Sequence, residues 1–211
     1  MKVLIVTGGI GSGKSLVCRM LTESHCIPVY EADRRVKALY SEIPSMLDDI
    51  EKTLEVSVRD DDGTFVPQRL ADVIFADHVA LKKLEDIVFP RLKEDFARWA
   101  DEHGKDVVAF ESATVLEKTY FDGFGDMNVL VNAPFDLRLS RAVERDGDRK
   151  RVKSRMTLQN LMNRLSEGFV DERIDFVIDN SGTLDELKSR IHDFVSYIGH
   201  NKNVTSAQQR C

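Results

Sequence analysis

The chain has 211 residues, of which 42% are hydrophobic and 31% are charged, and its formal net charge is −6. This length and composition exclude a wholly disordered chain and allow one domain, with or without an insertion, that buries a core without a metal or disulfide. The longest plain apolar runs, residues 3–6 and 107–110, are too short to cross a bilayer. The acidic balance argues against a general nucleic-acid-binding protein, so we expect neither a membrane nor a nucleic acid as a partner.

The cysteines and histidines give no metal signature. Cys18, Cys26 and Cys211 form no C-x-x-C motif, and the five histidines lack the spacing of metal ligands. An odd number of cysteines suits a reducing compartment. Only Lys2 and a four-residue apolar run precede Thr7, which is too little for a secretory signal. We therefore expect a cytoplasmic protein without a protein-held metal cluster.

Strand and helix patterns alternate along most of the chain. Apolar runs predict strands at residues 2–6, 28–31, 106–110, 128–132 and 174–178. Helical patterns lie between or after them, at residues 14–24, 33–41, 136–145, 153–165 and 183–198. Strands that alternate with helices predict an α/β fold with a five-stranded parallel sheet flanked by helices.

The block from residue 44 to residue 104 differs, because it reads as mostly helical with one turn at Asp60–Gly63. Apolar residues from Leu84 to Trp99 recur every three to four positions, which predicts one apolar face on a long helix. The block is too long for a simple crossover, so we expect an inserted helical subdomain on the substrate side. The expected organisation is a core at about 1–43 and 105–200, the insertion at about 44–104, a lid at about 145–155 and a polar tail at 201–211.

Residues 8–15, Gly-Gly-Ile-Gly-Ser-Gly-Lys-Ser, match the phosphate-loop pattern G-x-x-x-x-G-K-[ST]. They follow a predicted strand and open a predicted helix, where glycines let backbone N–H groups surround phosphate oxygens and the helix dipole adds positive potential. A dinucleotide fingerprint fails, since Lys14 stands where a third glycine is needed. The motif predicts a nucleoside-triphosphate site whose ATP-binding residues are Gly8, Gly9, Gly11, Ser12, Gly13, Lys14, Ser15 and Leu16.

Three residues of this loop have distinct expected roles. Lys14 would reach the β- and γ-phosphates, and the Ser15 hydroxyl would hold Mg²⁺. Leu16 stands where many such loops carry Thr, so it offers only its backbone N–H. The chain contains no Asn-Lys-x-Asp motif, which GTPases use to read the base. We therefore expect a small-molecule kinase.

Two carboxylates close the second predicted strand, within Tyr30-Glu31-Ala32-Asp33. Ligands of a doubly wound sheet bind at this end of the strands. Glu31 and Asp33 share one face if the strand continues through both. A carboxylate here would accept a proton from an acceptor hydroxyl that attacks the γ-phosphoryl group. We assign that catalytic role to Asp33, with a helix N-cap as the structural alternative.

Residues 145–155 carry six basic side chains against two acidic ones, a local charge of +4 in an acidic chain. Arginines that close over a phosphoryl group supply preorganised donors and exclude water. We therefore predict an arginine-rich lid with Arg145 as a catalytic residue. The alternatives are an ordinary solvated helix start and a nucleic-acid patch, and the second is disfavoured because no aromatic residue is interleaved.

The ordered set of motifs resembles the dephospho-CoA kinase family over nearly the whole chain. The segments that carry the resemblance are Val6–Ser15, Glu31-Ala32-Asp33, Asp62-Gly63, Arg69-Leu70, Val73, Phe75, Asp77, Leu84–Pro90, Val131–Pro134, Arg141, Arg145-Asp146, Arg155-Met156-x-x-Gln159 and Val177–Gly182. The resemblance implies a P-loop sheet of five parallel strands and phosphorylation of the ribose 3′-hydroxyl of dephospho-CoA by ATP. The products would be coenzyme A and ADP.

The resemblance also implies roles for residues outside the phosphate loop. Asp33 would act as the base or orient the acceptor hydroxyl. Arg141, Arg145 and Arg149 would contact phosphates from the lid side, and Asn180 would lie near the adenine. On the acceptor side, the resemblance implies Arg69, Phe89 and Glu111 as contacts for dephospho-CoA.

Three positions depart from the family pattern. Phe89 replaces the usual His, and residues 111–117 replace Asp-x-Pro-Leu-Leu-Phe-Glu with Glu-Ser-Ala-Thr-Val-Leu-Glu. Leu16 removes a hydroxyl beside the α-phosphate. None of these changes touches Lys14, Ser15 or Asp33, so we expect the phosphoryl-transfer chemistry to stand and the changes to concern recognition of the acceptor. The alternatives are another small-molecule kinase that acts on a nucleotide or sugar acid, and a nucleotide-binding protein without turnover.

Overall fold

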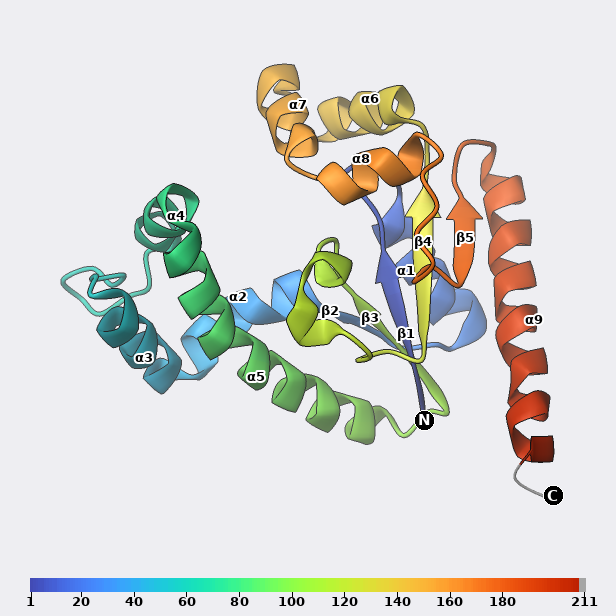
Figure 1. Ribbon diagram of the computed structural model, residues 1–211, viewed down its shortest axis with the longest axis horizontal. Coiled ribbons are helices and arrows are strands. Elements are labelled where there is room, and N and C mark those ends of the chain that lie inside the picture. Colours follow the sequence, from blue (N-terminus) through green and yellow to red (C-terminus); the bar gives the residue numbers. More distant parts are fainter. Residues whose placement is uncertain (209–211) are drawn as a thin grey trace. The chain divides into compact units, whose positions relative to one another are not determined.

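The computed structural model describes residues 1–208, and their side chains except those of residue 76 and residues 200–208. It divides into two compact units. The first comprises Met1–Val29 and Lys105–Cys211, and the second comprises Tyr30–Gly104. The second unit begins earlier than the insertion at residue 44 that the sequence suggests. Figure 1 shows the elements of both units.

The first unit contains the sheet and the helices that follow its strands. Its elements, with β2 crossing into the second unit, are β1 (Lys2–Thr7), α1 (Lys14–His25), β2 (Val29–Glu31), β3 (Val107–Glu111), the 3₁₀ turns η1 (Val115–Glu117) and η2 (Thr119–Phe121), β4 (Met127–Asn132), α6 (Phe135–Asp146), α7 (Arg149–Thr157), α8 (Asn160–Ser166), β5 (Phe176–Asp179) and α9 (Leu184–Gln208). The five strands form a parallel sheet in the order β2-β3-β1-β4-β5, which confirms the predicted α/β class.

Alternation along the strands decides what each face of the sheet packs against. Leu4 and Val6 of β1 point to the face covered by α1 and α9, where they join one buried cluster. Leu130 of β4 points to the opposite face and packs against Met162 and Leu165 of α8. Apolar layers on both faces explain why these strands read as continuous apolar runs.

Two predicted helices differ from the structure. The expected helix at 153–165 is broken into α7 and α8, because Gln159 has a non-helical backbone and its side chain accepts a hydrogen bond from Ile10. The helix expected to end at residue 198 continues to Gln208 as α9. Residues 209–211 of the expected tail lie outside the described residues. Within residues 1–208, no helix has both the length and the apolar character that a membrane span requires.

The second unit is helical apart from the last two residues of β2 and a small turn. It contains α2 (Ala32–Glu42), α3 (Pro44–Leu54), α4 (Pro67–Ala76) and α5 (His78–His103). A two-residue antiparallel bridge between Arg59 and Phe65 closes the predicted turn at residues 60–63. The predicted apolar face of α5 is confirmed, since its side chains from Leu84 to Phe96 at that spacing are buried.

A buried ionic network ties α2 to α5 and explains why α2 belongs to this unit. Asp95 of α5 accepts a hydrogen bond of 2.6 Å from the Tyr30 hydroxyl and bonds of 2.8 and 2.9 Å from the Arg35 guanidinium. Burial alone would raise the pKa of Asp95, but the bonds from Arg35 and Tyr30 outweigh it and lower that pKa. The network therefore fixes the first turns of α2, which carry Asp33.

Replacing Asp95 with Asn should destabilise the protein by about 2 kcal/mol at pH 7, because the Arg35 charge loses its buried carboxylate. The folded-state pKa of Asp95 is depressed, so its contribution is complete above the unfolded pKa near 4 and is lost as the pH falls below it. The difference in melting temperature between wild type and Asp95→Asn should therefore narrow from pH 7 to pH 3. Asp101→Asn, an exposed change on the same helix, is the control; an equal loss there would contradict the assignment.

Candidate active site

The phosphate loop joins β1 to α1, and its shape depends on two glycines with left-handed backbone. Gly11 has φ 78° and Gly13, the N-cap residue of α1, has φ 89°. A side chain on Gly13 would collide with the Asn180 amide, which donates a hydrogen bond of 2.8 Å to the Ser12 carbonyl. The loop is thus held tightly at the N-terminus of α1, as binding to phosphate requires.

Lys14 begins α1 and its ammonium contacts the carboxylate of Glu111 at the end of β3. The parallel register sets this pair, since Val6 lies beside Glu111 and the loop leaves β1 at Thr7. Both side chains are mostly buried, with 13% and 10% of their surface exposed. The structure therefore brings the predicted Lys14 and Glu111 together at one edge of the sheet.

The serines of the loop differ in exposure. The Ser12 hydroxyl is buried and has no hydrogen-bond partner among the described residues. The Ser15 side chain is exposed in the first turn of α1, where an oxygen ligand is available to a cation. The Leu16 N–H donates to the Gly13 carbonyl at 2.9 Å, and its side chain packs against the core.

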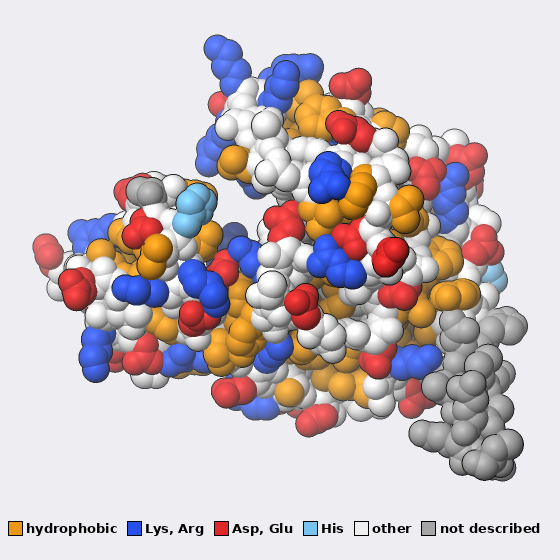
Figure 2. Space-filling view, viewed as in Figure 1, with side chains coloured by type: hydrophobic (Ala, Val, Ile, Leu, Met, Phe, Trp, Pro, Cys, Tyr) orange, Lys and Arg blue, Asp and Glu red, His pale blue; other side chains and the backbone are white. Residues whose placement is uncertain are grey.

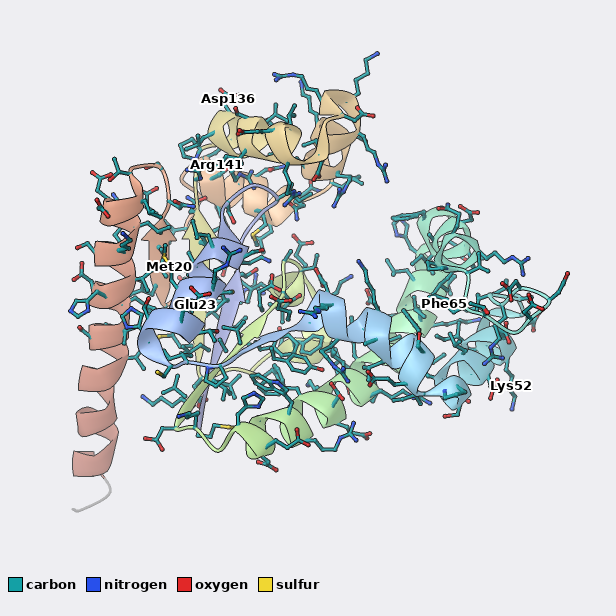
Figure 3. The ribbon with its side chains drawn as sticks, turned by 180° about the vertical axis from the view of Figure 1, so that it is seen from behind. Met20, Glu23, Lys52, Phe65, Asp136 and Arg141 are labelled. Carbon is teal, nitrogen blue, oxygen red and sulfur yellow. The ribbon has the colours of Figure 1, made fainter. Side chains whose placement is uncertain are left out.

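Asn180 and Arg141 lie next to each other beyond the loop. Arg141 donates a hydrogen bond of 2.8 Å to the Asn180 carbonyl. The Asn180 N–H donates in turn to the Asn132 carbonyl at 2.7 Å, which continues the pairing of β4 with β5. Figure 3 labels Arg141 on α6. Two residues predicted for the nucleotide therefore flank the loop from α6 and from the end of β5.

The expected lid is formed by the end of α6 and by α7. Arg145 pairs with its neighbour Asp146 at 2.6 Å, and Arg155 approaches the same carboxylate at 3.6 Å. Arg145 lowers the pKa of Asp146. Arg149 is exposed at the start of α7. Figure 2 shows basic side chains gathered over α7, so this surface presents positive charge to solvent.

Three predicted residues belong to the second unit. Asp33 is exposed in the first turn of α2, whose N-cap is Glu31, so the alternative N-cap role for Asp33 is wrong. The strand ends at Glu31, so the two carboxylates do not share a strand face. Arg69 is exposed on α4 and donates to the Arg59 carbonyl, while Phe89 is half-buried on α5.

Two residues near the loop carry interactions that sequence reasoning did not assign. Gln159 accepts a hydrogen bond of 2.8 Å from the Ile10 N–H, and Arg138 is 1% exposed beside Gly9. Gln159 is part of the family motif, but the sequence assigns it no role. Because the predicted helix at 153–165 runs through this position, its contact with the loop was not expected. Nothing in the sequence indicates that Arg138 is buried, since basic residues on an amphipathic helix normally face water.

The fold and site define a class of protein. A phosphate loop between β1 and α1, a lysine paired with a carboxylate at the end of the neighbouring strand, and a sheet of order 2-3-1-4-5 are the features of a P-loop kinase domain.

Comparisons with known proteins give the family. A sequence profile described as "Dephospho-CoA kinase" matches residues 2–186. The dephospho-CoA kinase of Chlorobaculum tepidum is 38% identical over 194 residues, which cover 88% of this chain and 89% of that protein. The chain therefore belongs to the dephospho-CoA kinase family.

Two solved structures agree in fold. TT1252 from Thermus thermophilus superposes with a TM-score of 0.77 at 25% identity, covering 93% of this chain and 97% of that one. The dephospho-CoA kinase from Campylobacter jejuni gives a TM-score of 0.61 at 18% identity, covering 95% and 98%. At this second identity the likeness concerns the fold alone.

Proposed function

We propose that the protein transfers the γ-phosphoryl group of ATP to the ribose 3′-hydroxyl of dephospho-CoA, giving coenzyme A and ADP. The observation that carries this proposal is the family match over residues 2–186, which includes the phosphate loop and the lid. The presence of Lys14, Ser15 and Asp33 speaks against a binding protein without turnover. The family match disfavours another acceptor such as a sugar acid.

In the proposed reaction, Asp33 accepts the proton of the ribose 3′-hydroxyl, and the oxygen of that hydroxyl bonds to the γ-phosphorus. The bond from that phosphorus to the β,γ-bridging oxygen breaks, and its electron pair stays with ADP. Lys14 stabilises the charge that spreads over the transferring group. Its contact with Glu111 supports this role, because that carboxylate holds the ammonium at the loop.

Mg²⁺ is part of the proposal. The exposed Ser15 hydroxyl at the start of α1 is a hard oxygen donor of the kind that this ion prefers, so this residue of the loop fits it. When bound, the ion neutralises charge on the β- and γ-phosphates. Ser15 would hold it directly, as in other phosphate loops.

The remaining residues would bind the two substrates. We assign Arg141 to the phosphates of ATP and Asn180 to its adenine side, and the hydrogen bond that joins these two residues next to the loop supports the assignment. Arg69 and Phe89 would contact dephospho-CoA from the helical unit. Cytoplasmic location is also part of the proposal, and the free thiols of Cys18 and Cys26 are consistent with a reducing compartment.

Arg145→Ala and Arg149→Ala should each lower kcat by about 10²-fold, because each removes a donor that closes over the phosphoryl group. Both side chains are exposed, so the melting temperature should stay unchanged. Steady-state kinetics and thermal unfolding measure the two effects. Arg19→Ala, an exposed change on α1, is the control, and wild-type kcat in both lid variants would contradict the lid assignment.

The substrate assignment is tested by ADP release with ATP, Mg²⁺ and dephospho-CoA, beside AMP, adenosine, gluconate and shikimate as acceptors. We expect turnover with dephospho-CoA and at least 10²-fold lower kcat/KM with the others. Preferred turnover of another acceptor would overturn the proposal and would direct attention to Phe89. Binding of ATP without transfer to any acceptor would favour the nucleotide-binding alternative.

A further inference from the structure

The side chain of Arg138 is a buried cation behind the phosphate loop. It is 1% exposed and is the largest of the fully buried side chains. Its terminal nitrogen donates to the Asn163 side-chain oxygen at 2.8 Å and to the Ser166 hydroxyl at 3.4 Å, both neutral groups on α8. Its Nε has no hydrogen-bond partner, and no carboxylate pairs with this guanidinium among the described residues.

The same side chain lies directly against the loop. A Cβ on Gly9 would collide with the Arg138 guanidinium, and a Cβ on Gly11 would collide with the Arg138 backbone carbonyl. Two loop glycines thus let α6 approach the loop backbone closely. Because of this approach, the positive charge of Arg138 lies directly against the backbone of the loop.

A buried charge without an oppositely charged partner is costly, and a nearby anion offsets that cost. The Phe135 ring, 5.7 Å from the guanidinium carbon, gives only weak compensation. Arginine stays protonated in proteins, so the charge persists even though burial lowers the pKa of Arg138. A nucleotide held by the loop would bring its polyphosphate close to this charge.

We infer that Arg138 is a positioning residue of the nucleotide site, which braces the loop at Gly9 and Gly11 and holds a positive charge that the phosphates of bound ATP or ADP balance. The inference rests on the proposed function, since it requires that the loop binds ATP. In the free protein the Arg138 charge has no ionic partner, and a bound nucleotide supplies one. Arg138 therefore strengthens nucleotide binding and lowers the stability of the free protein.

The first test compares Arg138→Met, which keeps length without charge, with Arg138→Lys, which keeps the charge without the planar fork. Calorimetry measures the Kd of ADP and ATP, and thermal unfolding measures the free protein. We expect Arg138→Met to weaken both nucleotides about tenfold without lowering the melting temperature of the free protein, and Arg138→Lys to retain most of the affinity. Wild-type affinity in Arg138→Met, or equal losses in both variants, would overturn the inference.

A second test leaves Arg138 in place. Asn163→Asp sets a carboxylate at the position that now accepts from the guanidinium at 2.8 Å, so the charge gains an internal partner. We expect this variant to bind ADP about tenfold more weakly. Asn160→Asp, an exposed change of equal charge on α8, is the control. Equal Kd values in the two variants would refute the inference, whereas failure of the wild type to bind ADP or ATP would refute the proposed function itself.

Discussion

Lys14→Ala is expected to lower kcat by about 10²- to 10³-fold, the typical effect of removing one preorganised donor to a transition-state oxyanion. The ammonium gains more interaction as charge spreads over the transferring phosphoryl group than it has with ground-state ATP. The change also removes the cation beside Glu111, a carboxylate with 10% of its side chain exposed. That remaining negative charge repels phosphate, so the Kd of ATP should rise as well.

Steady-state kinetics and calorimetry separate the two effects in Lys14→Ala. The double variant with Glu111→Gln should recover part of the ATP affinity and none of the lost kcat, because the repelling charge is gone and the donor is still missing. Lys52→Ala, an exposed change on α3, is the control for loss of a lysine. Unchanged kcat in Lys14→Ala would contradict the assignment of residues 8–15 as the phosphate loop.

The parts of the fold that the sequence predicted are those with local physical causes. Strands buried on both faces read as apolar runs, and residues 8–15 must join a strand to a helix to bind phosphate. The sequence left two positions open for Asp33, because Asp serves both as an N-cap and as a residue of the first helical turn. The backbone resolves this, since α2 begins one residue before Asp33 and Glu31 is the N-cap.

The parts that could not be predicted depend on contacts between distant segments. Glu111 reaches Lys14 because β3 pairs with β1 in one particular register. A single sequence does not specify the register between strands whose paired residues, such as Lys2 and Val107, are 105 positions apart. Gln159 interrupts a helical pattern, and its side chain accepts a hydrogen bond from the Ile10 N–H, 149 positions away. Arg138 is fully buried, although arginine side chains are rarely buried in proteins. Each of these three departures lies at the phosphate loop, where function outweighs local preference.

Asp33→Asn is the second change with a large expected effect: a loss of about 10²-fold or more in kcat with little change in the Kd of ATP. An amide cannot accept the proton of the acceptor hydroxyl, although it keeps the size of the side chain. Asp33 lies in the first turn of α2, so its negative charge also interacts with the helix dipole. Loss of that interaction from an exposed side chain should lower stability by only about 0.5 kcal/mol.

Kinetics with dephospho-CoA and thermal unfolding therefore give opposite answers for the two roles of Asp33. A catalytic carboxylate predicts a large fall in kcat with a nearly unchanged melting temperature, and a purely structural one predicts normal kcat with a lower melting temperature. Asp86→Asn, an exposed change on α5, is the matched control. A rise in the KM for dephospho-CoA with kcat unchanged would assign Asp33 to acceptor binding, because an interaction of equal strength in the ground and transition states does not affect kcat.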